Sequence, residues 1–133
     1  MDSTQVKRIV MCTALLGLIM AQAMIVDAKP SNKWRIKFEN RAQSDGDIVF
    51  LMQAIDGEPI KITTHIEDNM GENAIAKAVR DAFRAQSPKG FLKKVKTDDG
   101  EKVVLKKGSG RADFELSLVS SGVENLHIKI RRE

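Results

Sequence analysis

The chain contains few cysteine, proline and aromatic residues. Its 133 residues include one cysteine, three prolines, one tryptophan and no tyrosine, and aromatic residues make up 5% of the total. The cysteine, Cys12, lies in an apolar run near the N-terminus, so residues 29–133 hold none. Residues 29–133 therefore lack the disulfide framework of small eukaryotic secreted modules, which favours a bacterial origin. We expect a domain held together by burial and hydrogen bonding.

The first 28 residues have the pattern of an export signal. Two basic residues precede an unbroken apolar run at residues 9–20, and small residues follow at the positions that signal peptidases recognise. Cleavage is predicted after Ala23 or after Ala28. Residues 29–133 would then be released into the periplasm or the extracellular space.

The alternative to cleavage is a single-pass membrane anchor. Residues 9–26 carry no charge and are close to the minimum length for a helix that crosses a hydrocarbon core of about 30 Å. Lys7 and Arg8 would stay in the cytoplasm, and the globular domain would lie outside it. Membrane contact is expected only through residues 9–26, if they are uncleaved. Either way the chain divides into residues 1–28, a signal peptide or anchor, and residues 29–133, a single small domain.

Residues 29–133 predict three strands, one helix and four further strands. Alternation of apolar and polar residues marks the strands, and turn-forming residues separate them. This order predicts an α+β domain in which one amphipathic helix packs on a curled, mainly antiparallel sheet. Residues 48–55, nearly all apolar, are expected to form a central strand covered on both faces. The Asp-Gly turn at residues 56–57 predicts an antiparallel hairpin of strands 48–55 and 60–66, and the last four strands are expected to form two more hairpins. The predicted strands are 34–38, 48–55, 60–66, 91–96, 102–106, 112–118 and 126–130.

The predicted helix has clear boundary signals. Asn69 is a suitable N-cap, Glu72 follows three residues later as in a capping box, and Ser87-Pro88 ends the helix. Its apolar residues recur at helical spacing and form one stripe that needs a sheet to cover it. The residues of the stripe are Ala74, Ile75, Ala78, Val79, Ala82 and Phe83.

A lysine-rich hairpin is the one candidate binding site. Residues 29–133 contain 20 lysines and arginines against 16 aspartates and glutamates, and residues 89–107 alone account for that excess. Any preference for anions is therefore expected to arise from this hairpin. The alternative is that its lysines only deter pairing of a sheet edge with another sheet. The four lysines expected to contact an anionic partner are Lys94, Lys96, Lys102 and Lys106.

No residue pattern predicts catalysis, a metal site or a cofactor. His65 and His127 are the only histidines, and no third ligand accompanies them at a metal-binding spacing. Ser109 lies between glycines but lacks the strand-to-helix elbow of a serine nucleophile. The acidic residues at 98–101 surround a glycine and have the composition of a hairpin turn.

These observations favour a non-enzymatic binding or structural module that acts outside the cytoplasm. Its partner is expected to be a protein or an anionic component of the cell envelope or extracellular space, within a larger assembly. Nucleic acid is not expected, because no aromatic residues interleave with the lysines to stack on bases. Two alternatives remain: a small exported enzyme with an unrecognised site, and a protease inhibitor that presents residues 87–90 or 108–110 as an exposed loop.

Overall fold

The computed structural model describes residues 29–133, so the predicted signal or anchor at residues 1–28 lies outside the described residues. Within the described part, no helix is long and apolar enough to cross a membrane. Residues 29–133 form three strands, one helix and four more strands, in the predicted order. These elements are β1 (Lys33–Glu39), β2 (Gly46–Ala54), β3 (Ile60–Ile66), α2 (Glu72–Gln86), β4 (Leu92–Asp98), β5 (Lys102–Lys107), β6 (Phe114–Ser121) and β7 (His127–Arg132).

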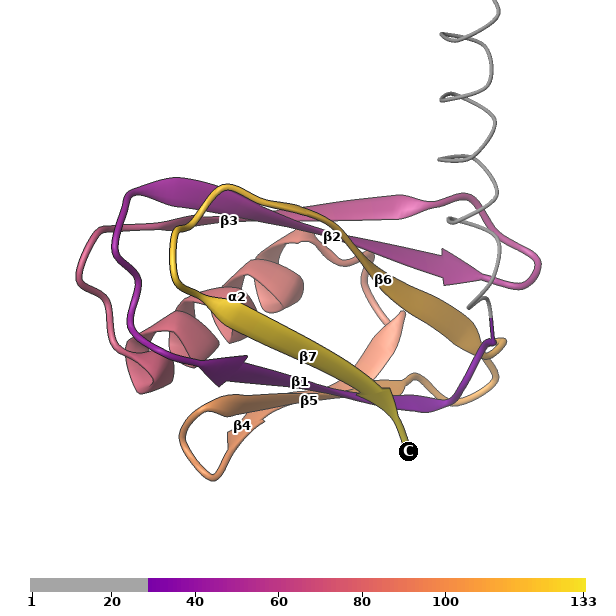
Figure 1. Cartoon of the computed structure of the whole chain (residues 1–133). Coiled ribbons are helices and arrows are strands. Elements are labelled where there is room, and N and C mark those ends of the chain that lie inside the picture. Colours follow the sequence, from indigo (N-terminus) through magenta and orange to yellow (C-terminus); the bar gives the residue numbers. More distant parts are fainter. Residues whose placement is uncertain (1–28) are drawn as a thin grey trace, which may run out of the picture.

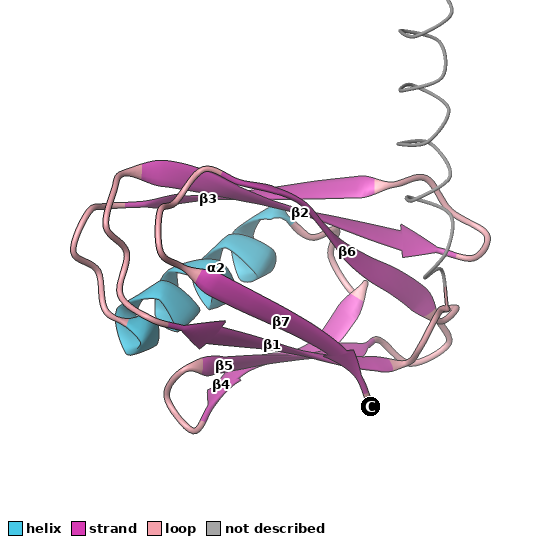
Figure 2. Cartoon of the chain, viewed as in Figure 1, coloured by secondary structure: helices cyan, strands magenta, loops and turns pink. Residues whose placement is uncertain are grey.

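The strands form two antiparallel sheets, with strand orders β4-β5-β1-β7 and β3-β2-β6. The sheets face each other across the core, and α2 closes one side of the molecule between β3 and β4 (Figure 1). Figure 2 shows β6 and β7 in front of the helix, where the two sheets meet without pairing. The prediction of one helix packed against antiparallel strands is confirmed. There are two sheets instead of one curled sheet, because β1 and β2 do not pair and each is an inner strand of its own sheet.

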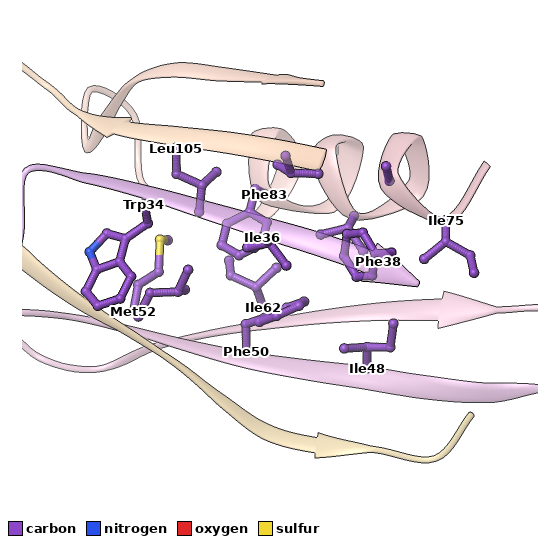
Figure 3. Close-up of a cluster of buried hydrophobic side chains, with 14 of the residues drawn as sticks. Trp34, Ile36, Phe38, Ile48, Phe50, Met52, Ile62, Ile75, Phe83 and Leu105 are labelled. Carbon is purple, nitrogen blue, oxygen red and sulfur yellow. The ribbon is translucent and has the colours of Figure 1, made fainter. Parts of the chain in front are cut away.

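Alternate residues of the strands fill the core between the sheets. On β1, Trp34, Ile36 and Phe38 point inward and are buried, while the charged residues between them point outward. Figure 3 shows these side chains facing those of β2 and the helix. The rings of Phe50 and Phe83 lie 5.4 Å apart at the centre of this cluster. Helix and sheets therefore share one core.

Strand β2 differs from its prediction. Ile48 and Phe50 are fully buried, but Val49 and Leu51 point away from the core and are only half-buried. The expectation that this strand is covered on both faces is wrong. The described helix lies against the inner side of the sheets, so no described element packs on the outer face of β3-β2-β6.

The start of α2 also differs. Its N-cap is Gly71, without a side-chain cap, and Glu72 is the first helical residue. Asn69 has a φ of 71°, a left-handed conformation that asparagine tolerates, so the chain turns there before the helix begins. Ala76 is buried and Ala74 is exposed, because β3 contacts one side of the helix and β4 and β5 contact the other. The predicted capping box and the Ala74 position are therefore wrong, while the other buried positions fit the predicted stripe.

Two hairpins are confirmed and one is not. β2 pairs with β3, and β4 pairs with β5 through a turn in which Asp99 and Gly100 have φ values of 51° and 75°. The predicted β6–β7 hairpin is wrong, because β6 pairs with β2 and β7 pairs with β1. In the connection between them, the carbonyl oxygen of Glu124 accepts a hydrogen bond from the N–H of Gln43 at 3.0 Å. This bond holds the connection on the β1–β2 loop, so the chain crosses from one sheet to the other.

Candidate anion-binding face

The outward side chains of the four-stranded sheet form a face that we call the cationic face. The strand register sets them in rows, with about 4.8 Å between strands and about 7 Å between rows. The first row is Lys94, Lys106 and Lys33; the second is Lys96, Val104, Arg35 and Arg131; the third is Asp98, Lys102, Lys37 and Lys129. Glu39 and His127 lie beyond the third row, and Glu133 follows β7.

The structure brings all four predicted lysines onto this face. Lys94 and Lys96 belong to β4, which is an edge strand, but Lys102 and Lys106 belong to β5, which lies between β4 and β1. Protection of a sheet edge therefore accounts for the first pair and not for the second.

Sequence reasoning missed the basic residues of β1 and β7. The cationic face holds nine basic side chains and three acidic ones, leaving 11 basic and 13 acidic residues in the rest of 29–133. The positive charge of this face is therefore not confined to the lysine-rich hairpin, which the count along the sequence singled out, because such a count mixes the two faces of each strand. The alternation of basic and apolar residues at 33–37 and 129–131 was the signal that could have found them.

A hollow of about 180 Å³ lies near the middle of the cationic face. Val104, the apolar residue of the second row, is only 2% exposed, because the long side chains around it cover it. The hollow has room for an anion such as phosphate or sulfate, since a water molecule takes about 30 Å³. Its lining comes from β5, β1 and β7 and consists of Arg35, Lys37, Lys102, Lys129 and Arg131.

Two carboxylates hold Arg35 in place beside the hollow. Its Nη1 lies 2.5 Å from Asp98 Oδ2, and its Nε lies 2.5 Å from Glu133 Oε1. The hydrogen bond from Arg35 lowers the pKa of Asp98, and hydrogen bonds from Arg35 and then Lys33 lower the pKa of Glu133. Both acids therefore stay ionised at neutral pH, and the guanidinium is fixed in a defined orientation.

Other cations of the face differ in how far they are neutralised. Glu39 lies 3.3 Å from both Lys37 and Lys129, and hydrogen bonds from Lys37 and then Lys129 lower its pKa. Four basic residues of the cationic face make no ion pair with any described residue: Lys94, Lys96, Lys106 and Arg131. These four leave the most positive charge for an external anion.

The two histidines do not come together. His65 is on β3 and His127 is on β7, in different sheets. His65 Nδ1 lies 2.8 Å from Asp47 Oδ1, which raises the pKa of the histidine. Among residues 29–133 there is no group of three or more histidine, cysteine, aspartate or glutamate side chains that could hold a metal ion.

The two predicted inhibitor loops do come together, at the end of the molecule where β2 turns into β3. The N–H of Gly108 donates to the carbonyl oxygen of Phe91 at 2.8 Å, which joins the segments around residues 87–90 and 108–110. With the β2–β3 turn they line a hollow of about 500 Å³. Ile55, beside this turn, is 70% exposed.

Charge segregation distinguishes the cationic face from the rest of the described surface. No family model, curated protein or solved structure matches this chain.

Proposed function

We propose that the protein is a non-enzymatic exported binding module that holds an anionic polymer of the cell envelope or extracellular space on its cationic face. The observation that carries this proposal is the sorting of nine basic residues onto one sheet face, while the remainder of 29–133 has more acidic than basic residues. Such sorting makes the surface charge asymmetric, so the cationic face attracts anions more strongly than the net charge of +4 indicates.

The arrangement favours a partner that carries many negative groups in series. Neighbouring basic residues are about 5 to 7 Å apart along and across the strands, so sulfate or phosphate groups on one extended chain can meet several of them at once. Each exposed pair contributes about 1 kcal/mol or less. Useful affinity therefore requires several contacts made together.

The hollow supplies a defined position within this broad face. Arg35 presents an oriented guanidinium there, and Arg131 lies opposite it on β7. Guanidinium groups bind sulfate and phosphate oxygens in a planar, forked geometry. Arg131, which makes no ion pair with a described residue, would bind one anionic group of the polymer in this way, and Arg35, whose Nε and Nη1 are bonded to carboxylates, would donate to it only through Nη2. The lysines of β4 and β5 would bind its neighbours.

Retention on immobilised heparin tests the proposal with the full chain. Changing Lys94, Lys96, Lys102 and Lys106 together to glutamine removes four positive charges from the cationic face. We expect the variant to elute at a clearly lower salt concentration than the wild type. Elution of the wild type should also depend steeply on salt, since exposed charges are screened over about 8 Å at physiological ionic strength.

A matched variant controls for net charge. Four exposed lysines outside the cationic face, Lys29, Lys61, Lys77 and Lys89, are changed to glutamine in the same way. The proposal predicts a much smaller decrease in retention for this control. Equal decreases would show that only net charge matters, and unchanged retention of the cationic-face variant would contradict the proposal.

Binding to other anions identifies the kind of partner. Vesicles containing phosphatidylglycerol present phosphate groups on a membrane surface, whereas heparin presents sulfates on a free polymer. The proposal predicts that heparin oligosaccharides compete for binding to the heparin column and that vesicles compete weakly. Strong competition by vesicles alone would favour a lipid surface as the partner.

A second candidate function, protease inhibition, rests on the exposed Ile55 and the two loops beside it. Three neighbouring segments at one end of a rigid fold resemble a surface that could enter a protease cleft. Inhibition assays against serine and cysteine proteases test this idea, with Ile55→Asp expected to abolish inhibition. An Ile55→Asp variant that inhibits as well as the wild type would exclude this surface.

A further inference from the structure

Two of the four sheet edges, those of β3 and β4, are covered by side chains that bond to their main chain. On β3, the side-chain amide of Gln86 pairs with the main chain of Thr63, accepting from its N–H at 2.8 Å and donating to its carbonyl at 2.7 Å. On β4, Arg84 donates to the carbonyl of Val95 at 2.7 Å. Charged side chains and covered main-chain groups are the usual means of preventing strand addition.

No residue of the described range 29–133 protects the edge of β6 in this way. Its second half consists of uncharged residues, and Leu118 and Val119 are 38% and 50% exposed. Phe114 exchanges two main-chain hydrogen bonds with Ser31 on the side away from β2, at 2.9 and 3.0 Å. Because alternate residues of an antiparallel strand direct N–H and C=O to the same side, Leu116 and Leu118 present theirs to this free edge too.

The edge of β7 faces the free edge of β6 at the place where the two sheets meet. The N–H of Glu133 donates to the carbonyl of Lys33 on β1 at 3.0 Å. By the same alternation, the main-chain groups of Ile128 and Ile130 point away from β1, toward β6. The side chains of these two isoleucines are partly buried and pack against the core. Two strand edges with open hydrogen-bonding groups and apolar side chains thus border one seam, which we call the β6–β7 seam.

Ser31 shows what fits in this seam. Its main chain pairs with Phe114 at the start of β6, and its Oγ donates to the carbonyl of Glu133, just beyond β7, at 3.0 Å. One residue of extended chain therefore already bridges the two edges at one end. A continuous strand in the same position would join the two sheets.

We propose that the β6–β7 seam is the binding site for an extended segment of a partner protein, which adds one strand between β6 and β7. One edge of the inserted strand pairs with the open main-chain groups of Leu116 and Leu118. Its other edge pairs with the open main-chain groups of Ile128 and Ile130. This is recognition by strand addition, in which main-chain hydrogen bonds give affinity and alternate side chains give specificity.

The chain's own residues before Ser31 do not suit this position. Continuing the pairing of Ser31 with Phe114 would set Lys29 opposite Leu116 and Asp27 opposite Leu118. Directly opposed residues point to the same side of a sheet, and Leu116 and Leu118 point toward the core. Two charged side chains would then face apolar surroundings, which is costly. A segment from another protein is the better occupant.

Charge complementarity defines the sequence of that segment. Its inward side chains must be apolar, because they join Leu118 and Ile130 at the core. Its outward side chains lie next to Lys129 and Arg131 of the cationic face, so acidic residues suit them. The partner segment therefore alternates apolar and acidic residues.

Calorimetric titration of the full chain tests this proposal. The probe is a blocked peptide in which valine alternates with glutamate, and the control peptide has the same composition with the valines grouped at one end. We expect the alternating peptide to bind at least about tenfold more tightly, a difference of about 1.4 kcal/mol. Equal binding of the two peptides would overturn the proposal, because it would indicate attraction to positive charge alone.

Two matched variants locate the binding site. Leu118→Lys places a charge on the β6 edge and should abolish the preference for the alternating peptide, whereas Ala85→Lys on the exposed side of α2 should preserve it. The variant in which Lys94, Lys96, Lys102 and Lys106 are changed to glutamine should keep this preference although it loses heparin binding. The two proposals can therefore fail separately. If the wild type forms a dimer that Leu118→Lys dissociates, the occupant is a second copy, and the proposed partner is wrong.

Amide hydrogen exchange in the wild-type chain gives a test without variants. The amides of Leu116, Leu118, Ile128 and Ile130 should exchange rapidly in the free protein and become protected when the alternating peptide binds. Protection of these amides without peptide would show that the seam is already paired, and would overturn the proposal.

Discussion

Replacing Phe83 with alanine tests the assignment of α2 as the element that joins the two sheets. Phe83 is fully buried, and its ring lies 5.4 Å from that of Phe50 on β2. The substitution removes a buried aromatic ring and leaves a cavity that close-packed neighbours fill only in part. Losses of this kind cost about 3 to 5 kcal/mol.

This loss is large for a domain of this size. Domains of comparable length have a free energy of unfolding of about 5 to 15 kcal/mol. A decrease of about 3 kcal/mol also corresponds to a fall in Tm of at least about 12 °C, since about 4 °C is lost per kcal/mol. We expect both the denaturant midpoint and Tm of the full chain to fall accordingly.

Urea unfolding followed by the fluorescence of Trp34, the single tryptophan, measures the effect. Ile55→Ala is the matched control, because Ile55 is apolar but 70% exposed, and a surface change of this kind alters stability by about 0.5 kcal/mol or less. An unchanged midpoint for Phe83→Ala, or equal losses for the two variants, would refute the placement of the helix stripe in the core.

Two further predictions follow from the structure. First, the pKa values of Glu39, Asp98 and Glu133 are lowered, so their ion pairs stabilise the fold above the ordinary carboxyl pKa, and this stabilisation is lost as pH falls through the lowered values. Over the same range, retention on dextran sulfate, whose sulfate esters keep their charge, should rise, because protonation frees the basic partners of these acids; retention that falls with acidification would contradict this. Second, residues 29–133 expressed alone should give a cooperative unfolding transition, and a molten or aggregated product would show that residues 1–28 contribute to folding.

The sequence predicted the element order because apolar alternation and turn residues are local signals. Trp34, Ile36 and Phe38 mark the inner face of β1 by their spacing alone, and the turn at Asp99 and Gly100 marks a hairpin. The pairing of β6 with β2, and of β7 with β1, could not be predicted in this way. These pairings join strands that are far apart in the sequence, and local patterns do not encode them.

The candidate site was predicted in part for the same reason. Lys94, Lys96, Lys102 and Lys106 were identified because they are close together in sequence, and the structure places them on one face. The contribution of Arg35 from β1 required knowledge of the strand order, since β1 reaches the lysine hairpin only by pairing with β5. The β6–β7 seam was missed, because the sequence favoured a hairpin there.

The most direct test of the cationic face is an NMR titration of the full chain, labelled with nitrogen-15, with a heparin oligosaccharide. Amide shifts should concentrate on β4, β5, β1 and β7, with the largest changes around Arg35 and Arg131, whereas β2 and β3 should change little. Shifts distributed over both sheets, or concentrated on α2, would contradict the account.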